Sequence, residues 1–308
     1  MTADWVAVSV RGRGLASRRL GRARTRRIAS ATSLDAAVAE LASTPYGREV
    51  RVGMGLREAQ HAVFATLIWH LRILAGWAPL GGADRVRLLA AGFEIGNIVG
   101  RLARLSGRSA AEPQTLGGLA ISWPRIESAR TPAEVRTRLA VSFWGDPGSE
   151  DLATVRSALH AAWARRVAEG VPEAGAWAES YATLMVARAL AAGSPIEPES
   201  VAGRNLRAVL GRGWQSATSL GQLSERVPRA AASVLDHAER AEDLWRAEAR
   251  WWARVETAGL QLSADPRPDA GIVVGLVALL AADAWRTRGA LEVAARGGRS
   301  ADWFDAVA

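Results

Sequence analysis

The sequence predicts an all-α fold, and three observations lead to this prediction. Residues that favour helices, above all alanine, leucine, arginine and glutamate, dominate the chain, whereas isoleucine and threonine are sparse. No segment alternates apolar and polar residues for long enough to predict a strand. Signals for helix starts and stops recur along the chain. Since 49% of the 308 residues are hydrophobic, a substantial core is expected.

Capping residues, prolines and glycines set the expected helix boundaries. Thr131, Pro132 and Glu134 give one clear start, with an N-cap, a proline at the first helical position and an acid three residues after the cap. The segment 106–130 is the least regular, and two prolines predict a linker at 264–269. Helices are expected at 33–42, 56–76, 84–105, 131–144, 149–168, 172–193, 196–211, 217–225, 228–258 (the longest) and 269–296.

The positive charge is concentrated near the N-terminus. All 39 cationic residues are arginines, the net charge is +8, and residues 11–27 hold eight arginines and no acid, so the remainder is balanced. We expect this basic segment to be a solvated helix face, a surface that meets an anionic membrane, or a nucleic-acid site. The segment has no aromatic residue for base stacking, which argues against nucleic acid.

The most apolar run, Ala270–Ala284, predicts a buried helix. At about 1.5 Å per residue it is too short to cross a hydrocarbon layer of about 30 Å, and Asp283 interrupts it. The other apolar run, 62–80, contains His70 and Arg72. We therefore expect no transmembrane span, and no signal peptide follows the paired arginines.

Few residues point to catalysis. The chain has no lysine and no cysteine, which excludes a Schiff base, a phosphate-loop lysine, a thiol nucleophile and thiolate metal ligands. Glu58 and His61 have the spacing of one half of a di-iron site, but the sequence offers no second pair. The acids within 236–243 alternate with arginines, which favours ordinary helix ion pairs. We expect no catalytic residue, no metal, no cofactor and no small-molecule substrate.

Two segments resemble each other. Asn97–Arg104 and Asn205–Arg212 share asparagine, a leucine or isoleucine, a small residue, leucine and arginine at matching offsets, 108 positions apart. Each places two apolar residues four positions apart, which predicts that both helices lie on a core. These pairs are Ile98 with Leu102 and Leu206 with Leu210. An internal repeat and chance similarity both explain the match.

Four places in the chain resemble one known family. They are the arginine-bearing opening helix Val8–Leu15, the segment Leu41–Tyr46, the acid-x-x-Asn-Ile segment Phe93–Ile98, and Ser180-Tyr181 with the later Asn205-Leu206. Together they resemble the central-stalk connector subunit of rotary V/A-type ATPases, called C in archaea and bacteria and d in vacuolar enzymes. We expect its signature residues to be structural: Tyr46, Glu94, Asn97, Ile98, Asn205 and Leu206.

The resemblance implies a fold and a function. The fold would be three similar helical bundles forming a funnel, here at 1–107 (with the basic segment 11–27), 108–215 and 216–308. The protein would cap the proteolipid ring on its cytoplasmic side, receive the axle subunits and transmit torque for proton or sodium transport. The stator membrane subunit would lie nearby, and no nucleic acid would bind. The expected partner contacts are Arg11, Arg13, Arg18, Arg19 and Arg22. The alternative is a basic helical protein that binds nucleic acid or an anionic membrane surface.

Overall fold

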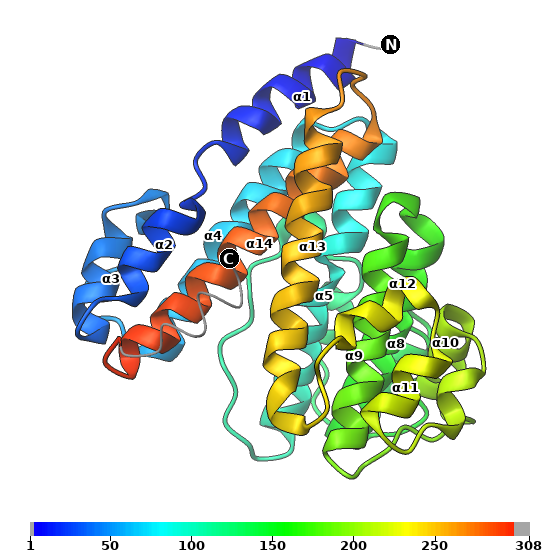
Figure 1. Cartoon of the computed structure of the whole chain (residues 1–308). Coiled ribbons are helices and arrows are strands. Elements are labelled where there is room, and N and C mark those ends of the chain that lie inside the picture. Colours follow the sequence, from blue (N-terminus) through cyan, green and yellow to red (C-terminus); the bar gives the residue numbers. More distant parts are fainter. Residues whose placement is uncertain (1–2, 299–308) are drawn as a thin grey trace. The chain divides into compact units, whose positions relative to one another are not determined.

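The computed structural model describes residues 3–298, and every regular element within that range is a helix (Figure 1). The predicted all-α fold is therefore confirmed. The described residues form two compact units. Unit 1 comprises residues up to Val86 and from Trp252 onward, and unit 2 comprises Arg87–Trp251. The division into three similar bundles stays a prediction.

Unit 1 is built around one apolar helix, α14 (Ala270–Ala295). Most of its residues are buried, and it packs against α1, α2, α3 and α4. The remaining elements are α1 (Ala3–Ala16), α2 (Gly21–Ala29), α3 (Leu34–Ala42), η1 (Pro45–Arg48), α4 (Leu56–Trp77), the start of α5 (Leu80–Leu105) and the end of α13 (Leu244–Ala264).

Glycines allow α14 to approach its neighbours closely. A Cβ atom built on Gly275 would lie 2.8 Å from the carbonyl oxygen of Gly259 on α13, which is too close for any side chain. A Cβ atom on Gly12 of α1 would lie 2.3 Å from the side chain of Leu276. Helix α14 is also long and apolar enough to cross a membrane, but 89% of its most apolar window is buried within the protein. The prediction of a buried helix is confirmed.

Unit 2 is built around α8 (Leu152–Gly170), α9 (Gly175–Ala191) and α10 (Val201–Leu210), which pack against one another. The short helices α11 (Leu220–Arg226) and α12 (Arg229–Ala232) lie against α9. The unit also contains most of α5, the start of α13, and the short elements η2 (Gly117–Leu119), α6 (Trp123–Ile126), α7 (Pro132–Ala140), η3 (Pro172–Ala174), η4 (Gly213–Ser216), η5 (Ser233–Leu235) and η6 (Ala241–Asp243).

The prediction of one long helix over 228–258 is wrong. The chain there forms α12, η5, a turn and η6 before α13 begins, and His237 has a left-handed backbone with φ of 60°. The carboxylate of Asp243 accepts hydrogen bonds from the backbone N–H groups of Glu239 and Arg240. Such a side-chain acceptor favours a new helix start over continuation of the old helix. The longest described helices are instead α5 and α14, with 26 residues each.

Where capping signals are local, the predicted starts agree with the structure. Ser33 accepts from the N–H of Ala36, and Thr131 accepts from the N–H of Glu134. Helix α10 begins five residues later than the predicted 196, because Ser200 is the N-cap and accepts from the N–H of Gly203. The expected helix at 84–105 begins earlier, at Leu80, directly after Pro79.

Candidate functional site

Glu94 of α5 holds part of the irregular segment of unit 2. Its side chain is completely buried, with 0% exposure. Oε2 accepts from the N–H of Ile121 at 2.6 Å, and Oε1 accepts from the N–H of Ser122 and from Nε1 of Trp144, both at 2.8 Å. Three donors on two separate loop segments therefore converge on one carboxylate. Glu94 acts as a structural tether.

Asn97 lies one helical turn further along the same face of α5. Its Nδ2 donates to the carbonyl of Gln114 at 2.9 Å, and its Oδ1 accepts from the N–H of Gln114 at 2.8 Å. The side-chain amide thus satisfies both the N–H and the carbonyl of one backbone residue in the irregular segment. Asn97 is buried and hydrogen-bonded, as expected, but it lies in the interior of α5 and does not fix a helix end. The acid-x-x-Asn spacing places both tethers on one helix face.

The other signature residues of unit 2 are also internal. Ile98 and Leu206 are fully buried, and so are their partners four residues on, Leu102 and Leu210, which confirms that both helices lie on a core. Asn205 donates from Nδ2 to the carbonyl of Val201 and accepts at Oδ1 from Nε of Arg165 on α8. It joins α10 to α8 and, like Asn97, lies within its helix.

Tyr46 and Asp283 form the corresponding tether in unit 1. Asp283 of α14 is 2% exposed and accepts from the Tyr46 hydroxyl at 3.0 Å. It also accepts from the N–H groups of Leu20 and Gly21, at 3.1 and 2.9 Å, where α2 begins. Burial raises the pKa of the Asp283 carboxyl, although these hydrogen bonds oppose the shift. One buried carboxyl therefore joins α14, η1 and the corner between α1 and α2.

The predicted partner contacts within the basic segment separate into two groups. Arg11 lies over the ring of Trp77, Arg13 donates to the carbonyls of Ser263 and Asp265, and Arg18 is exposed. These three remain near the surface of unit 1. Arg19 and Arg22 instead converge on a buried acid of α13, Glu256.

We call the group of Arg19, Arg22, Glu256 and Arg286 the arginine cluster. Nη2 of Arg286 donates to Oε2 of Glu256 at 2.5 Å, Arg22 reaches the same oxygen at 3.4 Å, and Arg19 lies 3.9 Å from Oε1. The Arg286 side chain is 4% exposed, whereas those of Arg19 and Arg22 are 23% and 52% exposed. Nε and Nη1 of Arg286 are buried and have no hydrogen-bond partner among the described residues.

Neither Glu256 nor Arg286 was singled out from the sequence, and Asp283 was recognised only as a break in an apolar run. The sequence did contain a pattern that points to these residues of α14. Asp283, Arg286 and Thr287 stand at positions i, i+3 and i+4 of an otherwise apolar helix, so they form one polar stripe on a buried element. Such a stripe predicts buried hydrogen-bond or ion-pair partners, although it does not name them.

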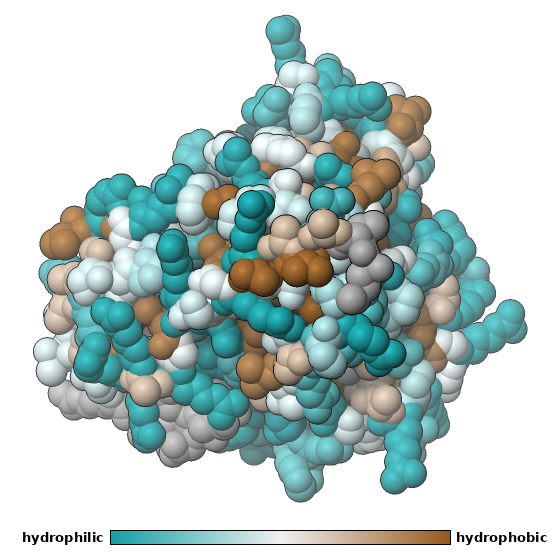
Figure 2. Space-filling view, turned by 90° about the horizontal axis from the view of Figure 1, so that it is seen from above, coloured by the Kyte–Doolittle hydropathy of each residue, from teal (hydrophilic) through white to brown (hydrophobic). Residues whose placement is uncertain are grey.

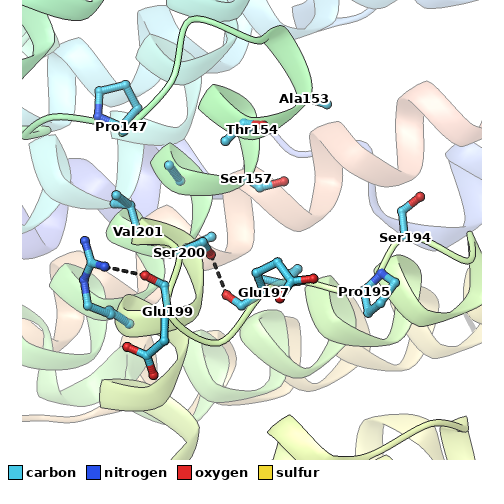
Figure 3. A pocket seen from close by; sticks show the side chains of 15 residues that line it. Pro147, Ala153, Thr154, Ser157, Ser194, Pro195, Glu197, Glu199, Ser200 and Val201 are labelled. Atoms are coloured by element: carbon cyan, nitrogen blue, oxygen red, sulfur yellow. Dashed lines mark hydrogen bonds between the residues drawn. The ribbon is translucent and has the colours of Figure 1, made fainter.

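A shallow hollow of about 520 Å³ lies at the surface of unit 2 (Figure 3). Pro147, Thr154 and Ser157 line one side, and the segment 194–204 lines the other. Much of the local polarity is internal, since Ser200 donates to the carbonyl of Glu197. No side chain in this hollow is paired as a nucleophile with a base, and we assign it no chemistry.

His160 of α8 and Tyr181 of α9 form a partly buried polar pair. The Tyr181 hydroxyl lies 2.7 Å from Nδ1 of His160, and the rings of Trp163 and Trp251 pack against Tyr181. Burial lowers the pKa of His160 to about 4, so the ring is neutral at pH 7. The ring contacts and the hydrogen bond give the pair a role in packing α8 against α9.

Two groups of residues were considered above for their chemistry, Glu58 with His61 and the acids within 236–243, and the following contacts of these residues are structural. Oε2 of Glu58 accepts from the N–H of Gly55 at the start of α4. Asp243 at the end of η6 pairs with Arg246 of α13 three residues on, although the long helix in which such pairs were expected does not form. Between residues 3 and 298 no group of three or more histidines and acids is arranged to hold a metal ion.

No protein-family model matches the chain, and a search of curated proteins found no match.

Proposed function

We propose that the protein is a non-catalytic connector subunit of a rotary V/A-type ATPase, located on the cytoplasmic face of a membrane. In this role it links the axle subunits to the proteolipid ring and transmits torque during proton or sodium transport. The resemblance on which the proposal depends consists of short segments along the chain, with Tyr46, Glu94 and Asn97 as its most distinctive polar residues.

The observation that carries the proposal is that those three residues are buried and hydrogen-bonded. Each is buried and makes hydrogen bonds that hold an irregular part of the chain on a long helix. A random match of polar residues would place them mostly on the surface, because polar residues are seldom fully buried without partners. Their roles give a physical reason for a tyrosine, an acid and an asparagine at these positions.

A second supporting feature is mechanical. A torque-transmitting body needs long helices and close, poorly compressible contacts. The approach of Gly259 to Gly275 and of Gly12 to Leu276 provides such contacts within unit 1.

An affinity purification tests the proposal. Tagged protein is recovered from its native membranes in mild detergent, and the associated proteins are identified by mass spectrometry. We expect axle subunits and a proteolipid. The variant Arg18→Glu reverses an exposed charge of the predicted contact surface, and Arg72→Glu, exposed on α4, is the matched control. Partners should be lost with the first variant and retained with the second.

Two outcomes contradict the connector role. One is the recovery of no rotary subunit from membranes that contain the intact ATPase. The other is co-purification of nucleic acid in its place, which would favour the alternative basic binding protein.

A further inference from the structure

Helix α1 of unit 1 has an exposed side that carries apolar residues. The helix packs on α4 and α14 through its other side, where Val8, Gly12 and Leu15 are buried (Figure 1). On the exposed side, Val6 is 46% exposed and Val10 is 65% exposed. A helix on the surface of a globular protein usually carries polar residues on the side that faces away from the core. Two valines one turn apart on that side are therefore a feature that requires an explanation.

The exposed valines belong to a row of small and apolar residues. Because a helix has 3.6 residues per turn, residues three or four positions apart lie on the same side. The exposed residues at this spacing along α1 are Ala3, Val6, Val10 and Gly14. A Cβ atom built on Gly14 would meet no atom from another part of the protein within 4 Å, so the space above this residue is open. We call these four residues the α1 stripe.

Arginines flank the α1 stripe on both sides. Arg11 and Arg13 follow Val10 by one and by three residues, which places them on opposite sides of the stripe. Both arginines are exposed, and so is Arg18 just beyond the end of α1. Arg11 lies over the ring of Trp77, and Arg13 donates to two backbone carbonyls. These partners are neutral, so neither contact neutralises the guanidinium charge.

The chain around the stripe supplies no balancing acid. Between Asp4 and Asp35 it has eight arginines and no carboxylate side chain. Arginines further along this segment meet acids from other helices, as Arg27 of α2 does with Glu40 of α3. The arginines beside the α1 stripe instead leave a positive surface with an apolar centre.

We propose that the α1 stripe lies on an anionic lipid bilayer, with its apolar residues at the boundary between headgroups and acyl chains. Interfacial helices lie in the plane of the membrane surface and insert their apolar side by about 5–10 Å. Arginines at the edges of the stripe extend to lipid phosphates, which match their planar donors. Each arginine near an anionic surface strengthens binding about fivefold, so Arg11, Arg13 and Arg18 together contribute roughly a hundredfold.

The stripe favours a bilayer over nucleic acid as the partner. Proteins bind nucleic acids through cationic contacts with phosphates and through aromatic residues that stack on bases. Val6 and Val10 provide neither kind of contact. A bilayer presents phosphates with an apolar layer directly beneath them, which matches valines flanked by arginines. The lipid contact goes beyond the connector role, whose partners are proteins, and it is tested on the purified chain without any rotary subunit.

The first experiment is vesicle sedimentation with the purified full chain at physiological ionic strength. Vesicles of phosphatidylcholine are compared with vesicles that also contain phosphatidylglycerol. We expect binding to the anionic vesicles only, and the double variant Arg11→Gln with Arg18→Gln should weaken it about twenty-five-fold. The matched control, Arg57→Gln with Arg72→Gln, removes two exposed arginines of α4 and has the same net charge. This control should retain the native affinity.

A fluorescent probe tests whether the stripe itself enters the lipid. The chain has no cysteine, so Val10→Cys provides a single thiol for an environment-sensitive dye. We expect the emission of this dye to shift to shorter wavelength when anionic vesicles are added, because an inserted dye leaves water. The matched control is Val52→Cys, at a valine that is 72% exposed in the turn before α4. Its emission should not shift.

Three results overturn the proposal: no binding to anionic vesicles, an equal loss of affinity in the two double variants, and an unshifted dye at Val10→Cys. Retention of the chain on duplex DNA without vesicle binding would assign the basic surface to nucleic acid instead. Circular dichroism verifies that each variant folds, and Arg18→Gln alone, with an expected fivefold loss, replaces the first double variant if that one does not. The affinity purification described above uses native membranes and protein partners, so failure of the lipid contact and failure of the connector role are distinguishable.

Discussion

Replacement of Glu94 by glutamine is the sharpest test of the polar tether in unit 2. Oε1 of Glu94 accepts two hydrogen bonds and Oε2 accepts one, from the N–H of Ile121. Glutamine keeps a single acceptor oxygen, so its best orientation preserves the pair at Oε1 and turns an NH2 donor toward Ile121. At least one buried N–H then loses its acceptor, which costs about 1–3 kcal/mol.

Loss of charge adds to this effect, since all three bonds end on a carboxylate and such bonds are worth about 1.5–3 kcal/mol each. We therefore expect Glu94→Gln to lower the free energy of unfolding by about 2–4 kcal/mol. Glu94→Ala leaves three buried donors unpaired and should cost more, about 3–6 kcal/mol. Because domains are stable by only about 5–15 kcal/mol, glutamine is the more useful variant.

Urea unfolding followed by tryptophan fluorescence and circular dichroism measures this change. The matched control is Glu169→Gln, because the Glu169 side chain is 58% exposed and, among the described residues, forms its ion pair with Arg165 on the same helix. Its expected effect is below about 0.5 kcal/mol. If both variants unfold at the same urea concentration, the hydrogen bonds of Glu94 do not contribute to the free energy of unfolding and the reasoning fails.

Three further predictions concern interior residues, and a fourth concerns an exposed glycine of α5. The neutral form of His160 is favoured in the folded protein, where its pKa is about 4 against 6.5 for a free histidine. Stability is therefore complete above pH 6.5 and falls by up to about 3 kcal/mol as the pH decreases toward 4. Urea titrations across this range should show a smaller loss for His160→Gln. Tyr46→Phe removes a donor to the buried carboxyl of α14, and calorimetric unfolding should show a loss of about 1–2 kcal/mol. Gly275→Ala places a Cβ atom 2.8 Å from a carbonyl oxygen of α13 and should cost about 1–3 kcal/mol. Gly96→Ala, on an exposed turn of α5 with open space around it, should add up to about 1 kcal/mol to stability in the same assay.

The sequence was most informative where structure depends on neighbours along the chain. Ser33 and Thr131 cap helices as predicted, because an N-cap needs only a hydroxyl and an N–H two or three residues on. The helix expected at 228–258 failed for a related reason. The apolar periodicity of this segment predicted a continuous helix. In the structure the chain turns at His237, and the Asp243 side chain accepts a backbone N–H group that a continuous helix would use.

Long-range partners could not be obtained in this way. Asp283 meets the start of α2 more than 250 positions away in sequence, and Glu256 meets Arg22 across a similar distance. A single sequence shows that a polar residue lies on a buried stripe, but the acceptor or donor is chosen by the packing of other helices. For the same reason the eight arginines of the basic segment were expected as one surface, although Arg19 and Arg22 approach the buried carboxylate of Glu256.

Each of the two units contains a buried carboxyl that holds an irregular segment, and this shared feature determines how variants can be interpreted. In each, a buried carboxyl on a 26-residue helix accepts backbone N–H groups from a segment that lacks its own regular partners: Glu94 from 121–122 and Asp283 from 20–21. In the view of Figure 2, hydrophobic residues lie in separate groups among hydrophilic ones. Substitutions of Glu94 or Asp283 are thus expected to lower stability, and any loss of partner binding would follow from unfolding. Exposed residues such as Arg18 are the opposite case, since we expect their substitution to change stability by less than about 0.5 kcal/mol. A binding defect in Arg18→Glu at unchanged urea stability would therefore identify a contact surface, whereas the same defect in a tether variant would not.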